Sequence, residues 1–217
     1  MTQAALLASG IAEMHLDVSI EAQQKLLAYL SLLQKWNKVY NLTAVRDPLE
    51  MVTLHLLDSL SVLPYIKANN LLDVGSGGGL PGIVLAICKP TLQVTTIDTV
   101  QKKAIFMRQV KGELGLSNLT VVHARVESYK PTEKFDAIIS RAFSELALFI
   151  KLTQHLLAEN GKWLAMKGVA PLQELEGLKI KMSKPIKLNK VVPLKVAGLD
   201  AERHLLVLEK LVLESHA

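Results

Sequence analysis

Hydrophobic residues recur at helical spacing in two segments near the start of the chain. Between residues 20 and 36 the spacing predicts an amphipathic helix whose apolar stripe is formed by Leu26, Leu27, Leu30 and Leu33. A second helix is predicted from Asp47-Pro48-Leu49-Glu50 to about residue 66, with Asp47 as its cap and Pro48 where a missing N–H costs nothing. Its apolar positions recur about every third residue, so it too should pack with one face inward. We therefore expect residues 1–66 to form a helical extension packed on the rest of the chain.

After residue 67, short apolar runs alternate with helical segments. The runs predict strands at Leu71–Val74, Leu92–Asp98, Leu119–His123, Ala137–Ser140, Lys162–Met166, Lys187–Lys195 and His204–Glu209. Helices are predicted near residues 81–88, 100–115, 144–157 and 170–179. This alternation predicts a doubly wound, mainly parallel α/β sheet. Only a short turn near Gly198 separates the last two strands, so an antiparallel hairpin is expected at the sheet's end. Residues 67–217 are expected to form this α/β domain.

The stretch from Asn70 to Gly82 predicts a strand that runs into a glycine-rich turn and then a helix. Gly75, Gly77 and Gly79 would let the backbone adopt positive φ and approach a ligand, while the helix N-terminus presents free N–H groups. Ligands of an open parallel sheet bind beyond the carboxyl ends of its strands, where this turn lies. The turn is therefore expected to bind a nucleotide cofactor.

The residues alone leave the kind of cofactor open. A dinucleotide fingerprint G-x-G-x-x-G fails from Gly75 because position 80 is leucine, but it matches from Gly77, two residues beyond the expected strand end. Asp73, inside the strand, suits a cationic ammonium or sulfonium ligand better than a pyrophosphate. Asp98 ends the next strand, 23 residues after Gly75. At about this spacing a carboxylate accepts hydrogen bonds from ribose hydroxyls, whichever of these nucleotide cofactors is bound. The same aspartate is also a suitable cap for the helix that follows.

Composition and charge limit the kinds of partner and the cellular compartment that we expect for this chain. The 217 residues carry a net charge of +5, and the pI is near 9.2, which favours an anionic partner such as nucleic acid, a phosphorylated metabolite or acidic lipid. The six histidines are scattered and the single cysteine, Cys88, lies in an apolar run, so no metal site and no internal disulfide are expected. No 18-residue stretch is free of charge and the N-terminus lacks a secretory pattern, so we expect a cytoplasmic protein with no membrane span.

The motifs together carry a resemblance to a known family. Asp73-x-Gly75-x-Gly77-x-Gly79 followed by Asp98 is similar to the S-adenosylmethionine site of class I methyltransferases. Beyond this general pattern, the chain resembles the bacterial small-subunit rRNA guanine-N7 methyltransferase G family, also called glucose-inhibited division protein B. The resemblance lies in Trp36-Asn37-x-x-x-Asn41-Leu42-Thr43, His55-x-x-Asp58-Ser59, Leu80-Pro81-Gly82, Arg125-Val126-Glu127, Ser140-Arg141-Ala142 and Lys167-Gly168. It covers nearly the whole chain in preserved order, and the six motifs together are specific.

The resemblance implies a Rossmann-like fold and the transfer of a methyl group from S-adenosyl-L-methionine to N7 of a guanine in 16S rRNA. It places Gly75 and Leu80 at the methionine side of the cofactor, in one loop with Gly77 and Gly79, and Asp98 at the ribose. It places Val126 and Glu127 at the adenine, and Arg141 between the cofactor and the target base. Guanine N7 carries a free lone pair and no proton, so no general base is expected.

Basic residues near strand ends on the ligand side are the expected RNA contacts, namely Arg125, Arg141 and Lys167. The implied partner is 16S rRNA or the small ribosomal subunit, and the chain is expected to act as a monomer. Two alternatives stay open at this point. One is a nicotinamide-dependent oxidoreductase that uses the Gly77 register, and the other is a non-catalytic RNA-binding ribosome assembly factor.

Overall fold

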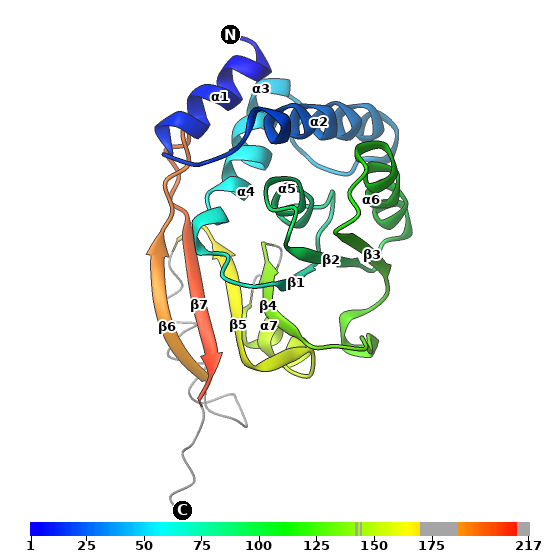
Figure 1. Cartoon of the computed structure of the whole chain (residues 1–217), viewed down its shortest axis with the longest axis vertical. Coiled ribbons are helices and arrows are strands. Elements are labelled where there is room, and N and C mark those ends of the chain that lie inside the picture. Colours follow the sequence, from blue (N-terminus) through cyan, green and yellow to red (C-terminus); the bar gives the residue numbers. More distant parts are fainter. Residues whose placement is uncertain (142, 144, 170–185, 212–217) are drawn as a thin grey trace, which may run out of the picture.

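The centre of the computed structural model is a seven-stranded sheet with the strand order β3-β2-β1-β4-β5-β7-β6 (Figure 1). The structure describes residues 1–141, 143, 145–169 and 186–211. Strands β1 to β5 pair in parallel, whereas β7 pairs antiparallel with both β5 and β6. The strands are β1 (Asn70–Val74), β2 (Gln93–Asp98), β3 (Leu119–His123), β4 (Phe135–Ser140), β5 (Leu157–Lys167), β6 (Ile186–Pro193) and β7 (His204–Lys210).

This arrangement confirms the predicted α/β class and the antiparallel hairpin at the end of the sheet. Every predicted strand is present, with one clear shift of a boundary: β5 begins at Leu157, five residues before the expected start at Lys162. Within the hairpin β7 lies inside, next to β5, and β6 forms the edge. The helix expected over residues 170–179 lies outside the described residues.

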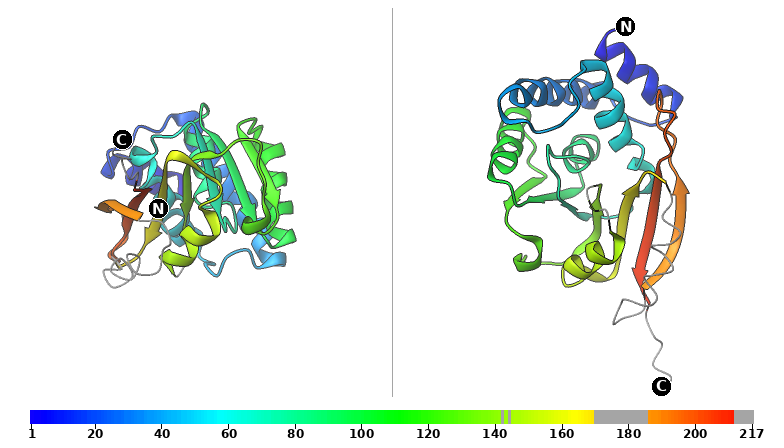
Figure 2. Two further views of the ribbon diagram at one scale, coloured as in Figure 1. Left: turned by 90° about the horizontal axis from the view of Figure 1, so that it is seen from below. Right: turned by 180° about the vertical axis from the view of Figure 1, so that it is seen from behind.

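Helices cover both faces of the sheet (Figures 1 and 2). One face packs against α5, α6 and the N-terminal helices, and the other against α7 and the 3₁₀ turn η3. Along β1, Leu71 belongs to the first of these two cores and Leu72 to the second, as the alternation of side chains along a strand requires. The helical elements are α1 (Gln3–Glu13), α2 (Ile20–Tyr40), α3 (Pro48–Met51), η1 (Val52–Leu57), α4 (Asp58–Leu60), η2 (Leu63–Tyr65), α5 (Gly82–Cys88), α6 (Gln101–Leu114), η3 (Val126–Ser128) and α7 (Leu146–Thr153).

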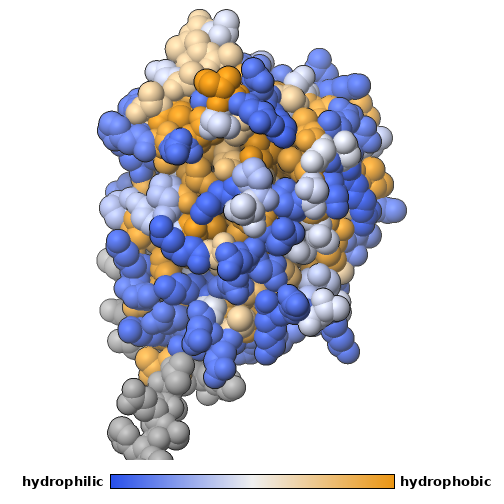
Figure 3. All heavy atoms as spheres, viewed as in Figure 1, coloured by the Kyte–Doolittle hydropathy of each residue, from blue (hydrophilic) through white to orange (hydrophobic). Residues whose placement is uncertain are grey.

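The N-terminal helices share a core with the sheet. Leu26, Leu30 and Leu33 of α2 are buried in the same cluster as residues of α5 and α6, which fits the predicted leucine stripe. Helix α1, which the sequence analysis did not single out, lies over the connection between β6 and β7, where Lys195 Nζ is 3.2 Å from Glu13 Oε1 (Figures 1 and 2). In Figure 3, hydrophobic residues gather in the upper part of this face, and hydrophilic residues cover most of the lower part.

The second predicted helix has the expected start but a different course. Asp47 caps it, since its Oδ1 accepts hydrogen bonds from the N–H groups of Leu49 and Glu50, each at 2.8 Å. From Val52 to Leu57 the helix then widens into a π-helix, and it ends at Leu60 rather than near residue 66. The expectation of one inward face is also wrong, because every residue from His55 to Leu60 is buried. This segment packs on α1 and α5 at once, so more than one of its faces is covered.

Candidate functional site

The chain changes direction across the sheet between β1 and β4. From β1 it continues outward to β2 and β3, whereas β4 lies on the other side of β1 and leads to β5. Such a reversal opens a crevice at the carboxyl ends of the two central strands. The glycine loop follows β1 there, and Arg141 follows β4. The two strand ends are joined by a hydrogen bond of 2.8 Å from Ser140 Oγ to the carbonyl of Val74.

The glycine loop has the backbone conformation that the sequence predicts. Gly75, Gly77 and Gly79 have φ angles of 70°, 59° and 92°, a region that other residues rarely adopt. A side chain at Gly79 would collide with Ile83, so this glycine allows α5 to begin close behind the loop. Gly77 donates its N–H to Asp98 Oδ2 at 2.9 Å, so the loop is held by the end of β2.

Asp73 lies beneath the loop and lines none of the cavities described below. Its side chain is fully buried, and its Oδ2 accepts the N–H of Gly82 at 2.9 Å. A Cβ at Gly82 would come within 2.7 Å of the same oxygen, so α5 starts directly against this carboxyl group. Burial raises the pKa of Asp73 to about 7, although the Gly82 hydrogen bond opposes this rise. Asp73 therefore supports the loop from below instead of meeting a cationic ligand directly.

Helix α2 holds the other side of the loop through a residue that sequence reasoning missed. The hydroxyl of Tyr29 is fully buried and donates to the carbonyl of Gly78 at 2.7 Å. The surrounding core raises the pKa of this phenol above its usual range, so it stays a donor. Tyr29 is 49 residues from Gly78 in sequence, and its hydrophobic neighbours in α2 give no hint of a polar role.

The first cavity at the crevice lies between the ends of β2 and β3 and is called the Asp98 cavity. It has a volume of about 340 Å³ and is lined by Val74, Gly75, Ile97, Asp98, Thr99, Val100, Lys103, Ala124, Arg125, Val126, Glu127, Phe143 and Leu152. Asp98 is 6% exposed, and its Oδ1 accepts the N–H of Val100 at 2.8 Å. A carboxylate oxygen can accept more than one hydrogen bond, so Asp98 can hold the loop and also accept from a ligand. Apolar side chains and one carboxylate suit a nucleoside.

Val126 and Glu127 form the rim of the Asp98 cavity on the η3 turn. Val126 is buried, whereas Glu127 pairs with the guanidinium of Arg125 at 2.7 Å on the surface. Its own backbone N–H and the Arg125 side chain lower the pKa of the Glu127 carboxyl, which keeps it charged at neutral pH. The predicted RNA contact Arg125 is thus already engaged by the predicted cofactor contact Glu127.

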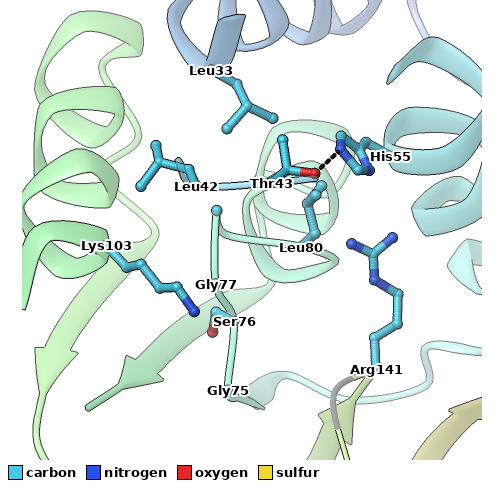
Figure 4. Close-up of a pocket in the computed structure, with 11 residues that line it drawn as sticks. Leu33, Leu42, Thr43, His55, Gly75, Ser76, Gly77, Leu80, Lys103 and Arg141 are labelled. Carbon is cyan, nitrogen blue, oxygen red and sulfur yellow. Dashed lines mark hydrogen bonds between the residues drawn. The ribbon is translucent and has the colours of Figure 1, made fainter. Parts of the chain in front are cut away.

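The second cavity, called the loop cavity, lies against the glycine loop and has a volume of about 280 Å³. It is lined by Leu33, Leu42, Thr43, His55, Gly75, Ser76, Gly77, Gly78, Leu80, Lys103 and Arg141. In Figure 4, Lys103 and Arg141 approach the loop from opposite sides, while Leu33 and Leu42 close it from above. The loop and Asp98 cavities share Gly75 and Lys103, so they adjoin at the end of β1.

His55 stands at one end of the loop cavity and is neutral at physiological pH. Its Nε2 is 2.9 Å from Thr43 Oγ1 (Figure 4), and its Nδ1 has no hydrogen-bond partner among the described residues. Burial, together with the nearby Arg141 charge, lowers the pKa of His55 to about 4. His55 and Thr43 both stand in motifs of the resemblance, but the sequence analysis assigns no role to either of them.

The third cavity, called the Arg203 cavity, has a volume of about 430 Å³ and lies between the π-helix and the ends of β5 and β7. Its lining consists of Val45, Leu54, His55, Asp58, Arg141, Met166, Lys167, Gly168, Leu194 and Arg203. It shares His55 and Arg141 with the loop cavity. Lys167 lines this cavity and donates to the carbonyl of Phe143 at 3.1 Å. Arg203, which the sequence analysis did not select, reaches it from the residue before β7.

The structure brings most of the predicted site residues into two adjoining cavities. Of the eight predicted cofactor residues, only Gly79 lines none of the three cavities, since it faces Ile83 instead. The remaining groups fit S-adenosylmethionine: a carboxylate with spare acceptor capacity, an apolar pocket beside it and a loop open enough for close approach. Among the described residues no group of three acidic, histidine or cysteine side chains could hold a metal ion. None of the described helices has the length and apolar character needed to span a bilayer.

Comparison with known proteins identifies close relatives of the chain. It is 63% identical over 202 residues to the ribosomal RNA small subunit methyltransferase G of Methylobacillus flagellatus, covering 93% of this chain and 96% of that relative. It is 54% identical over 212 residues to the protein of the same name from Aromatoleum aromaticum, covering 95% and 99%.

Solved structures share the fold at low sequence identity. The S-adenosylmethionine-dependent methyltransferase SibL in its apo form superposes with a TM-score of 0.58 at 13% identity over 86% of this chain and 69% of that one. The ribosomal protein L11 methylase of Lactobacillus delbrueckii subsp. bulgaricus gives a TM-score of 0.54 at 16% identity over 71% and 76%. A model of the family described as rRNA small subunit methyltransferase G matches residues 22–206, a range that contains the glycine loop and all three cavities. The chain therefore belongs to the rRNA small subunit methyltransferase G family.

Proposed function

We propose that this chain transfers a methyl group from S-adenosylmethionine to N7 of a guanine in small-subunit rRNA. As a member of its family it is an S-adenosylmethionine-dependent rRNA methyltransferase, which removes the nicotinamide-dependent oxidoreductase as an alternative. The observation that carries the proposal is the continuity of the three cavities. The Asp98 cavity adjoins the loop cavity through Gly75 and Lys103, and the loop cavity adjoins the Arg203 cavity through His55 and Arg141. A donor and an acceptor can therefore meet beside the glycine loop.

The cofactor is assigned to the first two cavities. Asp98 would accept hydrogen bonds from the ribose hydroxyls, with Val126 and Glu127 beside the adenine in the same cavity. Gly75 and Leu80 would lie along the methionine part in the loop cavity. Gly77 supports this placement by fixing Asp98, and Gly79 by giving α5 its close approach.

S-adenosylmethionine supplies a methyl group bound to a positively charged sulfur. The chain's own contribution is alignment, because guanine N7 already presents a lone pair and carries no proton. Holding two reactants in line can account for roughly 7 to 11 kcal/mol of a barrier. His55 is neutral and lies between the loop and Arg203 cavities, so it can donate or accept a hydrogen bond without carrying charge to the reacting nitrogen. Arg141 would act on RNA oxygens or on the guanine O6 edge, away from the positive charge that develops on the purine.

The RNA contacts assigned here are Arg141, Lys167 and Arg125. Arg141 and Lys167 line the Arg203 cavity together, whereas Arg125 is largely exposed on the rim of the Asp98 cavity. These positions support one RNA strand that enters along the cavities and keeps its backbone at the surface. The partner would be 16S rRNA, free or within the small ribosomal subunit, and the chain would act on it as a monomer in the cytoplasm.

A methyl-transfer assay on naked 16S rRNA and on purified small subunits tests this function. We expect radioactive label from S-adenosylmethionine in the RNA, at one guanine that reductive cleavage chemistry identifies as N7-methylated. Labelling at another atom or base would overturn the N7 assignment while leaving the enzyme class intact. RNA binding with no transfer to any small-subunit substrate would favour the non-catalytic assembly factor.

A further inference from the structure

A buried carboxylate joins two arginines at the wall of the Arg203 cavity. Asp58 Oδ2 accepts a hydrogen bond from Arg141 Nη1 at 3.0 Å, and Asp58 Oδ1 accepts one from Arg203 Nε at 2.9 Å. The side chain of Asp58 is 3% exposed, whereas those of Arg141 and Arg203 are 29% and 26% exposed. The carboxylate is therefore inside the wall, and both guanidinium groups reach past it towards the cavity.

This arrangement fixes two side chains that would otherwise be flexible and repel each other. A free arginine side chain samples many rotamers, and two like charges at close range repel each other. Asp58 offsets both effects by binding one guanidinium on each oxygen. Arg141 is held further by the carbonyl of Leu54 at 3.0 Å, and Arg203 by that of Glu202 at 2.8 Å.

The local backbone explains how one short segment supplies these groups. Leu54, His55 and Asp58 all line the Arg203 cavity, and they come from the π-helix η1 and the residue that follows it. The wider turn of a π-helix interrupts the regular hydrogen-bond ladder and often occurs at functional sites. Here the Leu54 carbonyl accepts the Arg141 guanidinium, while Asp58 one turn later takes both arginines.

The lining of the Arg203 cavity has the chemistry that a nucleotide needs. Arg141, Arg203 and Lys167 with one aspartate, Asp58, leave a net charge of +2, which suits a phosphate. Four apolar side chains offer surface for the faces of a base, namely Val45, Leu54, Met166 and Leu194. A volume of about 430 Å³ lies in the range of small-molecule sites. The cavity also opens onto the loop cavity through Arg141 and His55.

We propose that the Arg203 cavity receives the target nucleotide, and that Asp58 is the positioning residue that aligns Arg141 and Arg203 to hold it. This inference rests on the proposed function, because it takes the acceptor to be a nucleotide of the substrate RNA. Asp58 does not touch the nucleotide in this arrangement. Arg203 becomes a further binding residue, which acts with Arg141 on a phosphate or on the guanine edge.

The sign of the effect of Asp58→Asn separates positioning from simple electrostatics. The substitution removes a negative charge beside a polyanionic substrate, so charge alone predicts equal or tighter RNA binding. Loss of alignment predicts instead a slower transfer step, by between about tenfold and a hundredfold. We expect a single-turnover rate reduced to this extent at saturating RNA, with unchanged affinity for S-adenosylhomocysteine and with RNA affinity that is not reduced. Asp17→Asn, an exposed change of the same charge in the N-terminal segment, is the matched control.

A double-mutant cycle with Arg203→Gln tests whether Asp58 acts through Arg203. If it does, the transfer rate of the double variant should be little lower than that of the slower single variant, because each substitution already breaks the same Asp58–Arg203 pair. Multiplicative losses would mean that the two residues act independently and would overturn the positioning role. Thermal unfolding of each variant is measured alongside, and rates are compared well below every midpoint.

Failure of this inference differs visibly from failure of the proposed function. A wild-type chain that methylates a guanine at N7, with an Asp58→Asn variant of equal single-turnover rate, would overturn only the role of Asp58. If wild type transfers no methyl group, RNA affinity supplies the readout that does not depend on transfer. Arg203→Gln should then weaken binding of small-subunit rRNA, and unchanged affinity would remove the nucleotide from the Arg203 cavity.

Discussion

The carboxylate of Asp98 accepts a hydrogen bond of 2.9 Å from the backbone N–H of Gly77. This bond joins the end of β2 to the loop that follows β1, so it holds together the two parts of the proposed cofactor site. The same carboxylate holds the N–H of Val100 and lies 3.8 Å from Lys103 Nζ. The aspartate therefore shapes the site before any ligand arrives.

Asp98→Ala should weaken cofactor binding strongly. It would remove the proposed acceptor for the ribose hydroxyls, worth about 1.5 to 3 kcal/mol for each hydrogen bond to a charged group, and it would also release Gly77. Calorimetric titration with S-adenosylhomocysteine measures the loss. Asp136→Ala is the control, because Asp136 also accepts two backbone N–H groups but at the amino end of β1, far along the sheet from the loop. Equal affinity in both variants would refute the assignment of Asp98.

Arg141→Ala and Lys167→Ala should lower methyl transfer more than cofactor affinity. Both side chains line the Arg203 cavity and neither lines the Asp98 cavity, although Arg141 also lines the loop cavity beside the methionine part of the proposed cofactor site. The slope of log RNA affinity against log salt concentration should also become less steep, by nearly one for each phosphate contact that is lost. Lys162→Ala serves as control, since Lys162 is an exposed lysine of the same strand, five residues before Lys167. Parallel losses of S-adenosylhomocysteine affinity and transfer would place Arg141 at the cofactor only.

Single-turnover transfer at saturating RNA and cofactor should vary little between about pH 6 and 8.5. His55 lines both the loop cavity and the Arg203 cavity, and its pKa of about 4 keeps it neutral across this range. Guanine N7 has no proton to lose, so no side chain must change its protonation state during the step. A rise of unit slope with pH that His55→Gln abolishes would show that a base is required. An inflection that vanishes only in Asp73→Asn would instead arise from the support beneath the loop.

Asp73→Asn should change the pH dependence of stability. Burial raises the pKa of Asp73 from 3.8 to about 7, so the folded chain holds a proton there that the unfolded chain has lost. Stability should therefore fall as pH rises from about 4 to about 7, by up to about 4 kcal/mol, since each pKa unit corresponds to about 1.4 kcal/mol. Asparagine does not titrate, so the free energy of unfolding of the variant, relative to that of wild type, should be higher at pH 8 than at pH 5. Urea denaturation at both pH values measures this, and an identical difference at the two values would contradict it.

Removal of residues 1–66 should make the remaining chain aggregate. The leucines of α2 and the buried residues of the π-helix belong to one core with α5 and α6, so their loss would expose a wide apolar surface. Size-exclusion chromatography and thermal unfolding of the fragment 67–217 test this expectation. A monomeric fragment that unfolds cooperatively and binds S-adenosylhomocysteine would show that the extension folds and acts separately.

The sequence predicted those features that depend on local pattern. The alternation of strands and helices, the positive φ angles of the glycine loop and the Asp47 cap each follow from a few adjacent residues. The bond from Tyr29 to Gly78 and the pair formed by Asp58 and Arg203 could not be predicted in this way, because 49 and 145 residues separate the partners. Such contacts depend on how whole elements pack, and no periodicity reports them.

The π-helix was missed for a related reason. Apolar residues at every third position between Met51 and Leu60 fit a helix of any type, and the extra residue in its turn leaves no mark on the pattern. Its consequence is nevertheless local, since it sets the positions of Leu54, His55 and Asp58 around Arg141. The motif His55-x-x-Asp58-Ser59 is the available signal in the sequence, and the Arg203 cavity supplies its physical reason.

The hydrogen bond from Tyr29 to the Gly78 carbonyl couples the order of helix α2 to that of the glycine loop. A ligand that reduces the motion of the glycine loop must also restrain Tyr29. Part of the binding free energy therefore goes into ordering helix α2. Amide hydrogens in the middle of α2 should then exchange with solvent more slowly when S-adenosylhomocysteine is bound, although no α2 backbone atom need touch it. By the same linkage, substitutions that loosen the packing of α2 would lower the affinity of the chain for the cofactor. Variation in this outer helix is therefore a means of adjusting cofactor affinity.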